Sequence, residues 1–252
     1  MMFFTHRATA IVLCVQSAFM LAACQSTSTF QRHKTPLATS SSPTPGVQGP
    51  AHSARCPQLR LLCFSGSSRK DSFNKKLARL ACNLARQRGV SVTFVDLTDF
   101  PMPLYNGDYE AKNGLPPEAV KFKSLVKQHD ALMIASPEYN ALPTPLLLNV
   151  LYWASRPGRS TERHGAAFAG KTVLTVAASP GLMGGVRSLM SLRSLLEDLR
   201  LIVHPRPFRL ARARAAFGEN GELLDEKEQR KLEKIIDRFV EFATKRLQKA
   251  EC

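Results

Sequence analysis

A serine-rich stretch with a single arginine, "SGSSRKDSFN" (residues 65–74), is the clearest candidate for chemistry in this sequence. It follows an apolar run and precedes a helical pattern. Ser67, Ser68 and Ser72 offer hydroxyl groups, and Arg69 offers a forked cation. A helix that begins here would also point its positive N-terminus into the same space. These groups favour binding of a phosphate.

The spacing excludes two common classes of nucleotide site. The sequence contains no G-x-x-x-x-G-K-[ST] pattern for a nucleoside triphosphate and no G-x-G-x-x-G pattern for a dinucleotide. A third alternative is a cysteine-dependent phosphatase, because Cys63 and Arg69 form C-x5-R, with a thiolate as nucleophile. Bulky Phe64, Lys70 after the arginine and the lack of an Asp-Pro dipeptide weigh against this alternative. A buried strand position is favoured for Cys63.

A second candidate stretch is "SPEYNALPTPLLLNVLYWAS" (residues 136–155). Pro137 stiffens the backbone, Tyr139 supplies a flat face, and Glu138 and Asn140 supply polar edges. This combination is suited to a planar ring.

A third stretch, "SPGLMGG" (residues 179–185), is rich in glycine. Gly181, Gly184 and Gly185 would let the backbone approach a ligand closely. A phosphate cradle, a ring platform and a glycine loop together describe a mononucleotide with a large flat ring, and flavin mononucleotide (FMN) fits best.

Alternating strand-like and helical patterns must position these stretches. Short apolar runs occupy residues 59–64, 91–97, 131–135, 171–178 and 201–203, and helical patterns occupy 74–87, 117–128, 145–154, 186–199 and 225–249. The alternation predicts an α/β fold with a doubly wound, five-stranded parallel sheet and helices on both faces. The three candidate stretches follow the first, third and fourth strands, at the carboxyl edge where such sheets bind ligands.

Composition supports one basic domain with an N-terminal extension. Lys and Arg number 35 against 20 Asp and Glu, which suits an anionic ligand. Residues 1–25 form a signal-like apolar segment ending in the lipobox-like "LAAC", with Cys24 as a possible lipid anchor; an upstream start codon is the alternative. Residues 26–57 form a Pro/Ser/Thr-rich disordered linker, and residues 58–252 form the folded domain. The six cysteines and six histidines lack metal-ligand spacing, so we expect no metal.

The stretches "GSSRKDSFN", "PEYN" with the following P-x-x-L-x-N-x-L-x-W-x-S, and "SPGLMGG" resemble the NAD(P)H-dependent FMN reductases of flavodoxin-like fold, which include quinone, azo-dye and chromate reductases. The resemblance covers roughly residues 59–247. It implies that the FMN phosphate is held at the first stretch, the isoalloxazine at the second and the opposite ring edge at the third. The implied cofactor-binding residues are Ser67, Arg69, Ser72, Phe73, Asn74, Pro137, Glu138, Tyr139, Asn140, Ser179, Gly181, Gly184 and Gly185.

The resemblance also implies a mechanism and partners. NADPH or NADH gives hydride to flavin N5, and a quinone-like, azo or other small acceptor then takes two electrons in a ping-pong cycle, so no side chain is catalytic. An electron-carrier flavodoxin is the alternative, but those carriers are acidic. We expect a homodimer or homotetramer, no nucleic acid, and a cytoplasmic location because NAD(P)H is found there; a lipoprotein anchored through Cys24 is the alternative.

One departure is the loop at residues 156–170, which looks longer and more basic than is typical. Its Arg156, Arg159 and Arg163 either grip the 2′-phosphate of NADPH or belong to a solvated flap.

Overall fold

The computed structural model describes residues 58–158 and 161–251. The predictions for residues 1–25 and 26–57, including Cys24, lie outside the described residues.

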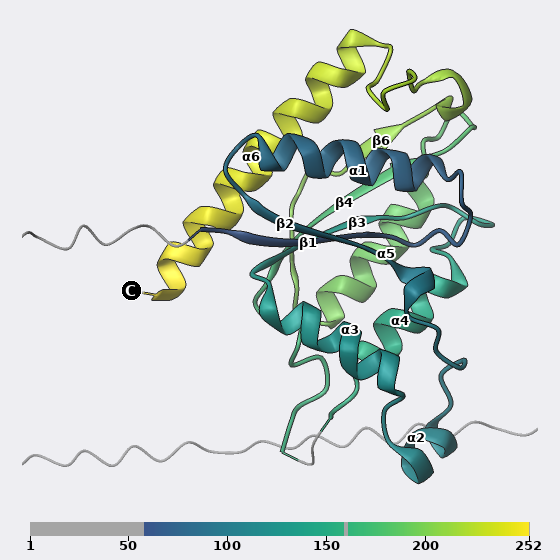
Figure 1. The fold of residues 1–252 in the computed structure, drawn as a ribbon, viewed down its shortest axis with the longest axis vertical. Helices are drawn as coiled ribbons and strands as arrows, with labels where there is room; N and C mark the ends of the chain where they lie inside the picture. Colours follow the sequence, from purple (N-terminus) through teal and green to yellow (C-terminus); the bar gives the residue numbers. More distant parts are fainter. Residues whose placement is uncertain (1–57, 159–160, 252) are drawn as a thin grey trace, which may run out of the picture. The chain divides into compact units, whose positions relative to one another are not determined.

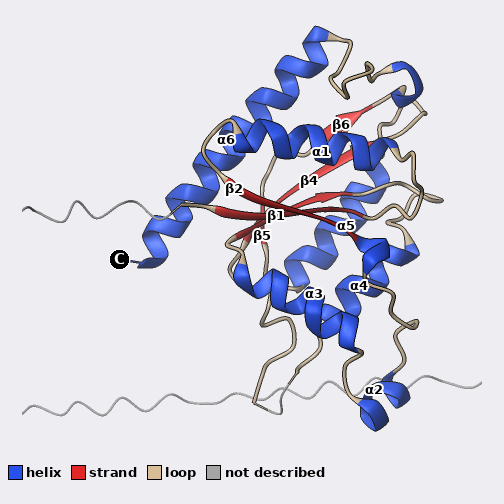
Figure 2. Cartoon of the chain, viewed as in Figure 1, coloured by secondary structure: helices blue, strands red, loops and turns tan. Residues whose placement is uncertain are grey.

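The core of the structure is a parallel sheet (Figure 2). Its strands are β1 (Arg60–Ser65), β2 (Ser91–Asp96), β3 (Ala131–Ala135), β4 (Thr172–Ala178), β5 (Ile202–Val203) and β6 (Phe208–Leu210). The order is β2-β1-β3-β4-β5, and β6 also pairs with β4, beyond β5. This order is the flavodoxin-like one, so the predicted fold class is confirmed.

The last position of the sheet is shared by two short strands where one was predicted. Residues 204–207, "HPRP", separate β5 from β6. Pro205 and Pro207 have no N–H to donate to the ladder, so the edge strand cannot run through them. Strand β6 therefore continues alongside β4 from Val176 to Ala178.

Helices cover both faces of the sheet, with α1 and α6 on one face and α3, α4 and α5 on the other (Figure 1). Their bounds are α1 (Phe73–Arg86), α3 (Pro117–Gln128), α4 (Pro145–Ser155), α5 (Val186–Asp198) and α6 (Glu226–Glu251). Each predicted helix is confirmed to within two residues. The short helix α2 (Gly107–Asn113) was not predicted, because it buries no residue and has no apolar periodicity.

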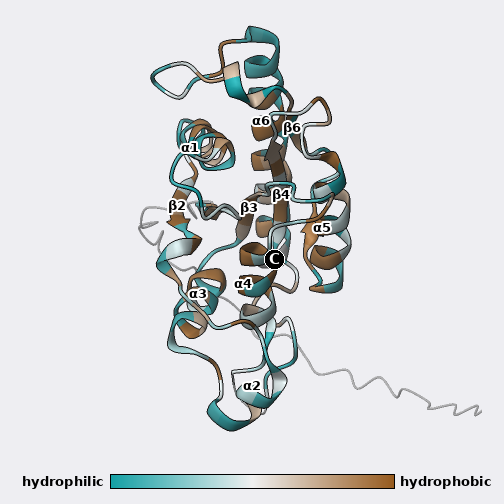
Figure 3. Cartoon of the chain, turned by 90° about the vertical axis from the view of Figure 1, so that its right-hand side faces the viewer, coloured by the Kyte–Doolittle hydropathy of each residue, from teal (hydrophilic) through white to brown (hydrophobic). Residues whose placement is uncertain are grey.

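Two apolar layers, one on each side of the sheet, hold these elements together. Strands β1, β3 and β4 are almost entirely buried, as strands covered by helices on both faces must be. Figure 3, turned by 90° from the view of Figure 1, shows β4 with the brown colour of apolar residues. Among the described residues, no helix is long and apolar enough to cross a membrane.

Candidate functional site

The predicted ligand-binding edge lies where β1 and β3 run side by side. The chain leaves β1 toward β2 on one side and returns to β3 on the other, so a crevice opens between the loops that follow β1 and β3. The N–H of Gly66 donates to the carbonyl of Ala135 at 2.9 Å. A Cβ on Gly66 would lie 2.8 Å from Leu147 Cβ, so close packing of α4 requires a glycine here.

The first loop, residues 66–72, offers two buried hydroxyl groups. Ser67 Oγ accepts a hydrogen bond from the N–H of Arg69 at 3.3 Å. Ser72 caps helix α1, because its Oγ accepts from the N–H groups of Asn74 and Lys75. Neither hydroxyl donates to any acceptor among the described residues. Both can therefore donate to a ligand while they keep the loop in shape.

Arg69 and the N-terminus of α1 supply positive charge at this loop. Arg69 is exposed, and its guanidinium forms no ion pair or hydrogen bond within the described part of the chain, not even with nearby Asp71. The first turn of α1 contains no acidic residue. No acidic side chain within the first turn therefore balances the partial positive charge of the helix end.

Asn74 connects the first loop with the third. Its Nδ2 donates to the carbonyl of Ala178 at 2.8 Å, and its Oδ1 accepts from the N–H of Ala178 at 2.9 Å. This pair of bonds fixes the start of α1 against the end of β4. The structure thus gives Asn74 a positioning role, and direct contact with a phosphate stays a prediction. Phe73, the first residue of α1, is half-buried and stacks on Phe217 at 6.4 Å.

The second loop ends in a tight turn. Tyr139 and Leu142 exchange both backbone hydrogen bonds at 3.0 Å, and Asn140 and Ala141 between them have φ values of 50° and 69°. Two consecutive residues with positive φ define a type I′ turn, in which asparagine is favoured at the first position. The turn projects Tyr139 and Leu142 into solvent. Pro137, by contrast, is buried at its base.

Glu138 is used inside the protein rather than at a free polar edge. Its Oε2 accepts from the N–H groups of Arg187 and Ser188 at 3.0 and 3.1 Å, and its Oε1 pairs with the Arg187 guanidinium at 2.6 Å. Burial would raise the pKa of Glu138, but the hydrogen bonds from Ser188 and Arg187 outweigh it and hold the pKa below its usual value. Glu138 thus places a negative charge at the N-terminus of α5.

The glycines of the third loop are required for close packing of the chain as well as for the approach of a ligand. Gly184 and Gly185 have φ values of 60° and 80°, and a Cβ on Gly185 would lie 2.7 Å from Ala177 Cβ. These positions therefore need glycine whether or not a ligand binds. Gly181 is exposed, a Cβ there would contact only Ser179 Oγ at 3.7 Å, and its N–H donates to Ser179 Oγ at 3.2 Å.

Sequence reasoning missed the loop after β2. A pocket of about 280 Å³ lies between this loop, α4 and the first loop, and includes Ser68, Met102 and Asn149 among its lining. Asn149 Nδ2 and Trp153 Nε1 both donate to the carbonyl of Pro103, at 2.9 and 2.8 Å. The Asn and Trp of the helix motif hold this loop at the crevice. The signal that was available is the proline-rich "PMP" (residues 101–103), separated by three residues from the end of a predicted strand.

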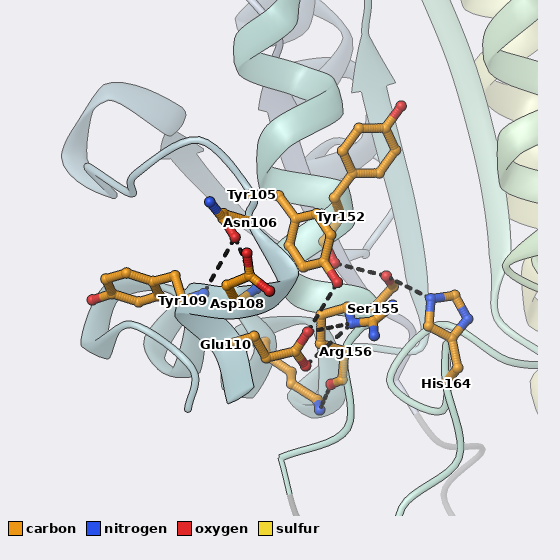
Figure 4. A network of polar contacts seen from close by, with 10 residues as sticks. Tyr105, Asn106, Asp108, Tyr109, Glu110, Tyr152, Ser155, Arg156 and His164 are labelled. Atoms are coloured by element: carbon orange, nitrogen blue, oxygen red, sulfur yellow. Dashed lines mark hydrogen bonds and ion pairs between the residues drawn. The ribbon is translucent and has the colours of Figure 1, made fainter. Parts of the chain in front are cut away.

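The first residue of the loop at residues 156–170 is bound by the acidic side chain of Glu110 (Figure 4). Arg156 Nε donates to both carboxylate oxygens of Glu110 at 3.2 and 2.9 Å, and its guanidinium lies over the ring of Tyr105. Tyr105 in turn donates its hydroxyl to Glu110 at 2.9 Å. Arg156 is therefore not a free cation, which disfavours the prediction that it grips NADPH. Arg159 lies outside the described residues.

A second carboxylate holds the same loop. Glu162 accepts hydrogen bonds from Lys123, Lys127 and the N–H of Gly158 at 2.7 to 2.8 Å. Burial would raise the pKa of Glu162, but these donors lower it to about 2. Among the described residues of the loop, Arg156 is thus bound to α2 and Glu162 to α3, which disfavours a freely solvated flap.

The phosphatase alternative conflicts with the position of Cys63. The side chain is fully buried in the middle of β1, next to Cys82. Burial raises the pKa of the Cys63 thiol well above its usual value, so no thiolate is available as a nucleophile. The predicted buried role is the one the structure shows.

Comparisons with known proteins agree with this geometry. Residues 59–214 match the family model described as NADPH-dependent FMN reductase. The chain is 36% identical over 172 residues to the NAD(P)H-dependent FMN reductase of Pseudomonas aeruginosa, covering 67% of this chain and 86% of that protein. It is 32% identical over 185 residues to the NADPH:quinone oxidoreductase of Arabidopsis thaliana, covering 71% and 89%.

Solved structures lead to the same family. The flavoenzyme NAD(P)H:(acceptor) oxidoreductase of Paracoccus denitrificans superposes with a TM-score of 0.64 at 28% identity, over 74% of this chain and 98% of that one. With the family model matching more than half of its length, the chain belongs to the NADPH-dependent FMN reductase family.

Proposed function

We propose that this protein binds FMN at the three loops and uses it to transfer electrons from NAD(P)H to quinone-type acceptors. The observation that carries the proposal is the contrast between two helix N-termini at the crevice. Glu138 already occupies the N-terminus of α5, whereas the first turn of α1 contains no acidic residue and Arg69 pairs with no carboxylate among the described residues, nearby Asp71 included. A dianionic phosphate supplies the charge that this second site lacks.

The residues present fit the cofactor in the order that the sequence predicts. Ser67, Arg69 and Ser72 would hold the phosphate through charge-assisted hydrogen bonds. The exposed turn at Tyr139 and Asn140 would lie against the flat ring. Asn74 and Glu138 would act by fixing the three loops relative to one another.

When bound, FMN would supply the redox chemistry, accepting hydride from NAD(P)H and returning two electrons to a quinone-type acceptor in a ping-pong cycle. The chain's own contribution is binding and orientation, and we assign no catalytic side chain. The relatives named as quinone reductases support the acceptor class. The electron-carrier alternative is disfavoured because the family model and these relatives are reductases.

The location and assembly remain part of the proposal. A cytoplasmic location keeps the protein with its NAD(P)H, and we expect a homodimer or homotetramer that binds no nucleic acid. The competing lipid anchor at Cys24 is tested by the intact mass of the native protein, because acylation adds a mass that a free N-terminus does not carry.

A direct test of function uses the purified protein. We expect a yellow preparation with a flavin absorption spectrum and NADPH-dependent reduction of a benzoquinone well above the rate with the same concentration of free FMN. A colourless protein that takes up no added FMN, or turnover equal to that of free FMN, would contradict the proposal.

A further inference from the structure

A larger pocket, of about 1120 Å³, lies at the interrupted edge of the sheet, between α5, α6 and residues 204–207. We call it the basic groove. Its floor reaches Thr175 of β4, beside which neither β5 nor β6 runs, because β5 ends at Val203 and β6 begins at Phe208. No residue of the three loops of the candidate flavin site is among the residues that line the groove. Figure 3 shows β6 with α5 and α6 at this side of the sheet.

The lining of the basic groove carries positive charge only. Eight of its sixteen lining residues are Lys or Arg, and none is Asp or Glu. Arg206, Lys234 and Arg238 form no ion pair within the described part of the chain, whereas Arg193 and Arg230 each pair with a glutamate of their own helix. The concentration of unpaired cations predicts an anionic partner.

A buried histidine next to the groove responds to this charge. His204 is buried between Phe239 and Phe242 of α6. Burial, aided by the positive charges of Arg206 and Arg238, lowers the pKa of His204. The histidine is therefore neutral at pH 7 and adds nothing to the cationic groups around the groove.

The apolar part of the lining is aliphatic. Val186, Leu189, Val203 and Ile235 line the groove, and Met190, also in the lining, is 67% exposed. No aromatic residue of the described chain lines it. Nucleobases bind proteins by stacking on aromatic side chains, so this lining disfavours a nucleotide or a single-stranded nucleic acid. An aliphatic surface surrounded by cations instead matches a phosphate that carries a hydrocarbon chain.

We propose that the basic groove binds the phosphate headgroup of an anionic phospholipid, with the beginning of an acyl chain against Met190 and its aliphatic neighbours, so that this edge of the sheet docks on anionic membranes. Such binding is peripheral and needs no membrane-spanning helix. It is independent of the proposed flavin chemistry. It also does not depend on acylation of Cys24.

The test compares three versions of the full chain, a parent and two triple variants. All three carry Cys24→Ser, so acylation cannot contribute to any of them. One reverses groove charges (Arg206→Glu, Lys234→Glu, Arg238→Glu). The matched control reverses three exposed cations that have no ion pair and lie outside the groove (Lys76→Glu, Lys112→Glu, Lys249→Glu), so both change the net charge equally. Cosedimentation is measured with vesicles of equal parts phosphatidylglycerol and phosphatidylcholine, and with pure phosphatidylcholine. Circular dichroism verifies folding.

We expect the groove variant to bind the anionic vesicles about a hundredfold more weakly than the parent, and the control to lose less than tenfold. Neutral vesicles should show no difference among the three proteins. Equal losses in both variants would overturn the proposal, because binding would then follow net charge alone. A parent that forms a dimer which only the groove variant loses, as seen by gel filtration, would also overturn it in favour of a subunit contact.

A single variant separates lipid from free phosphate. Met190→Ser removes the exposed aliphatic side chain and leaves every charge in place. It should weaken binding of micelle-free dihexanoyl phosphatidylglycerol severalfold and leave binding of tripolyphosphate unchanged. If tripolyphosphate binds the groove as well as the lipid does and Met190→Ser changes neither, the groove is a site for free polyphosphate and the lipid proposal is wrong.

Discussion

Two arginine-containing loops of this protein use their cations in opposite ways. In the loop at residues 156–170, Arg156 is bound by both oxygens of Glu110 and covers Tyr105. In the loop at residues 66–72, Arg69 has no carboxylate partner among the described residues, although Asp71 is only two positions away. The paired arginine stabilises a loop, whereas the unpaired one is available to a ligand. Residue type alone does not distinguish these roles, but the pairing does.

The same contrast separates the two helices that begin at the crevice. Helix α5 receives its negative charge from Glu138, and helix α1 has no acid in its first turn. Both helices begin at the same edge of the sheet. The N-terminus of α5 binds the carboxylate of Glu138, whereas no carboxylate of the described residues is bound at the N-terminus of α1. The first three predictions each remove one charged side chain from these loops or helix N-termini.

The largest expected effect is on FMN binding. Arg69→Ala should weaken FMN roughly ten- to a hundredfold, because a hydrogen bond with a charged partner contributes about 1.5 to 3 kcal/mol. Riboflavin, which has no phosphate, should bind the variant and the parent about equally. Fluorescence titration measures both affinities. Lys70→Ala, which removes the neighbouring exposed cation, is the control and should lose less than Arg69→Ala. Equal loss of FMN and riboflavin would mean that Arg69 supports the fold instead.

Glu138→Gln should lower the free energy of unfolding by about 1 to 2 kcal/mol at pH 7. The neutral amide can neither form the ion pair with Arg187 nor place a negative charge at the start of α5. The pKa of Glu138 is lowered in the folded state, so its contribution is complete above about pH 4.5 and is lost as the pH falls through the folded value. Urea unfolding at pH 7 and pH 3 should therefore show a difference that shrinks at the lower pH.

The control for Glu138 lies on α5, the helix whose start Glu138 contacts. Glu197 forms an exposed pair with Arg193, and Glu197→Gln should change stability by less than about 0.5 kcal/mol. If the two variants lose equal amounts, Glu138 is an ordinary surface acid and the contrast between the helix N-termini has no energetic basis.

Glu162→Gln should loosen the loop at residues 156–170 without unfolding the sheet. The amide cannot pair with Lys123 and Lys127, so trypsin should cleave after Arg163 severalfold faster than in the parent. The pKa of about 2 implies that the parent loop is fully anchored above about pH 4.5 and released only as the pH falls toward 2. Glu118→Gln, in an exposed pair with Lys121, is the control. Identical cleavage rates would show that the loop is held by something other than Glu162.

The smallest effect concerns the turn at Tyr139–Leu142. Ala141 has φ = 69°, a conformation that costs a residue with a Cβ about 1 kcal/mol. Ala141→Gly should therefore raise the melting temperature by about 2 °C, as measured by calorimetry. Ala78→Gly, inside helix α1, is the opposite control and should lower it. A lower melting temperature for Ala141→Gly would mean that the turn is not strained.

Most of the fold could be predicted because its signals are local and repeated. The strands of "LLCF" and "ALMIA" are apolar on both faces, and each is followed by a loop and a helix. The split of the edge strand was harder to predict. Strand β6 has only three residues, and it pairs with β4 beyond the two prolines that interrupt the edge strand. Helix α2 buries no residue, so it leaves no apolar period to detect.

For the candidate site, the sequence predicted which loops lie at the carboxyl edge of the sheet more accurately than it predicted the role of each residue. Ser72 caps helix α1 and Arg69 is exposed without an ion pair among the described residues, and their contact with a phosphate stays a prediction. Asn74 and Glu138 were assigned to the ligand, yet their contacts are with Ala178 and the start of α5, residues distant in sequence. Which polar group is already satisfied depends on tertiary contacts that no local pattern contains.

The most direct test of the central claim is the ionisation of the bound FMN phosphate, followed by ³¹P NMR between pH 5 and pH 8. A free phosphate monoester titrates with a pKa of about 6. If Arg69, the serine hydroxyls and the N-terminus of α1 hold the phosphate, the bound resonance should keep its dianionic shift throughout this range, because those groups favour the charged form. A bound resonance that titrates like that of free FMN would contradict the account.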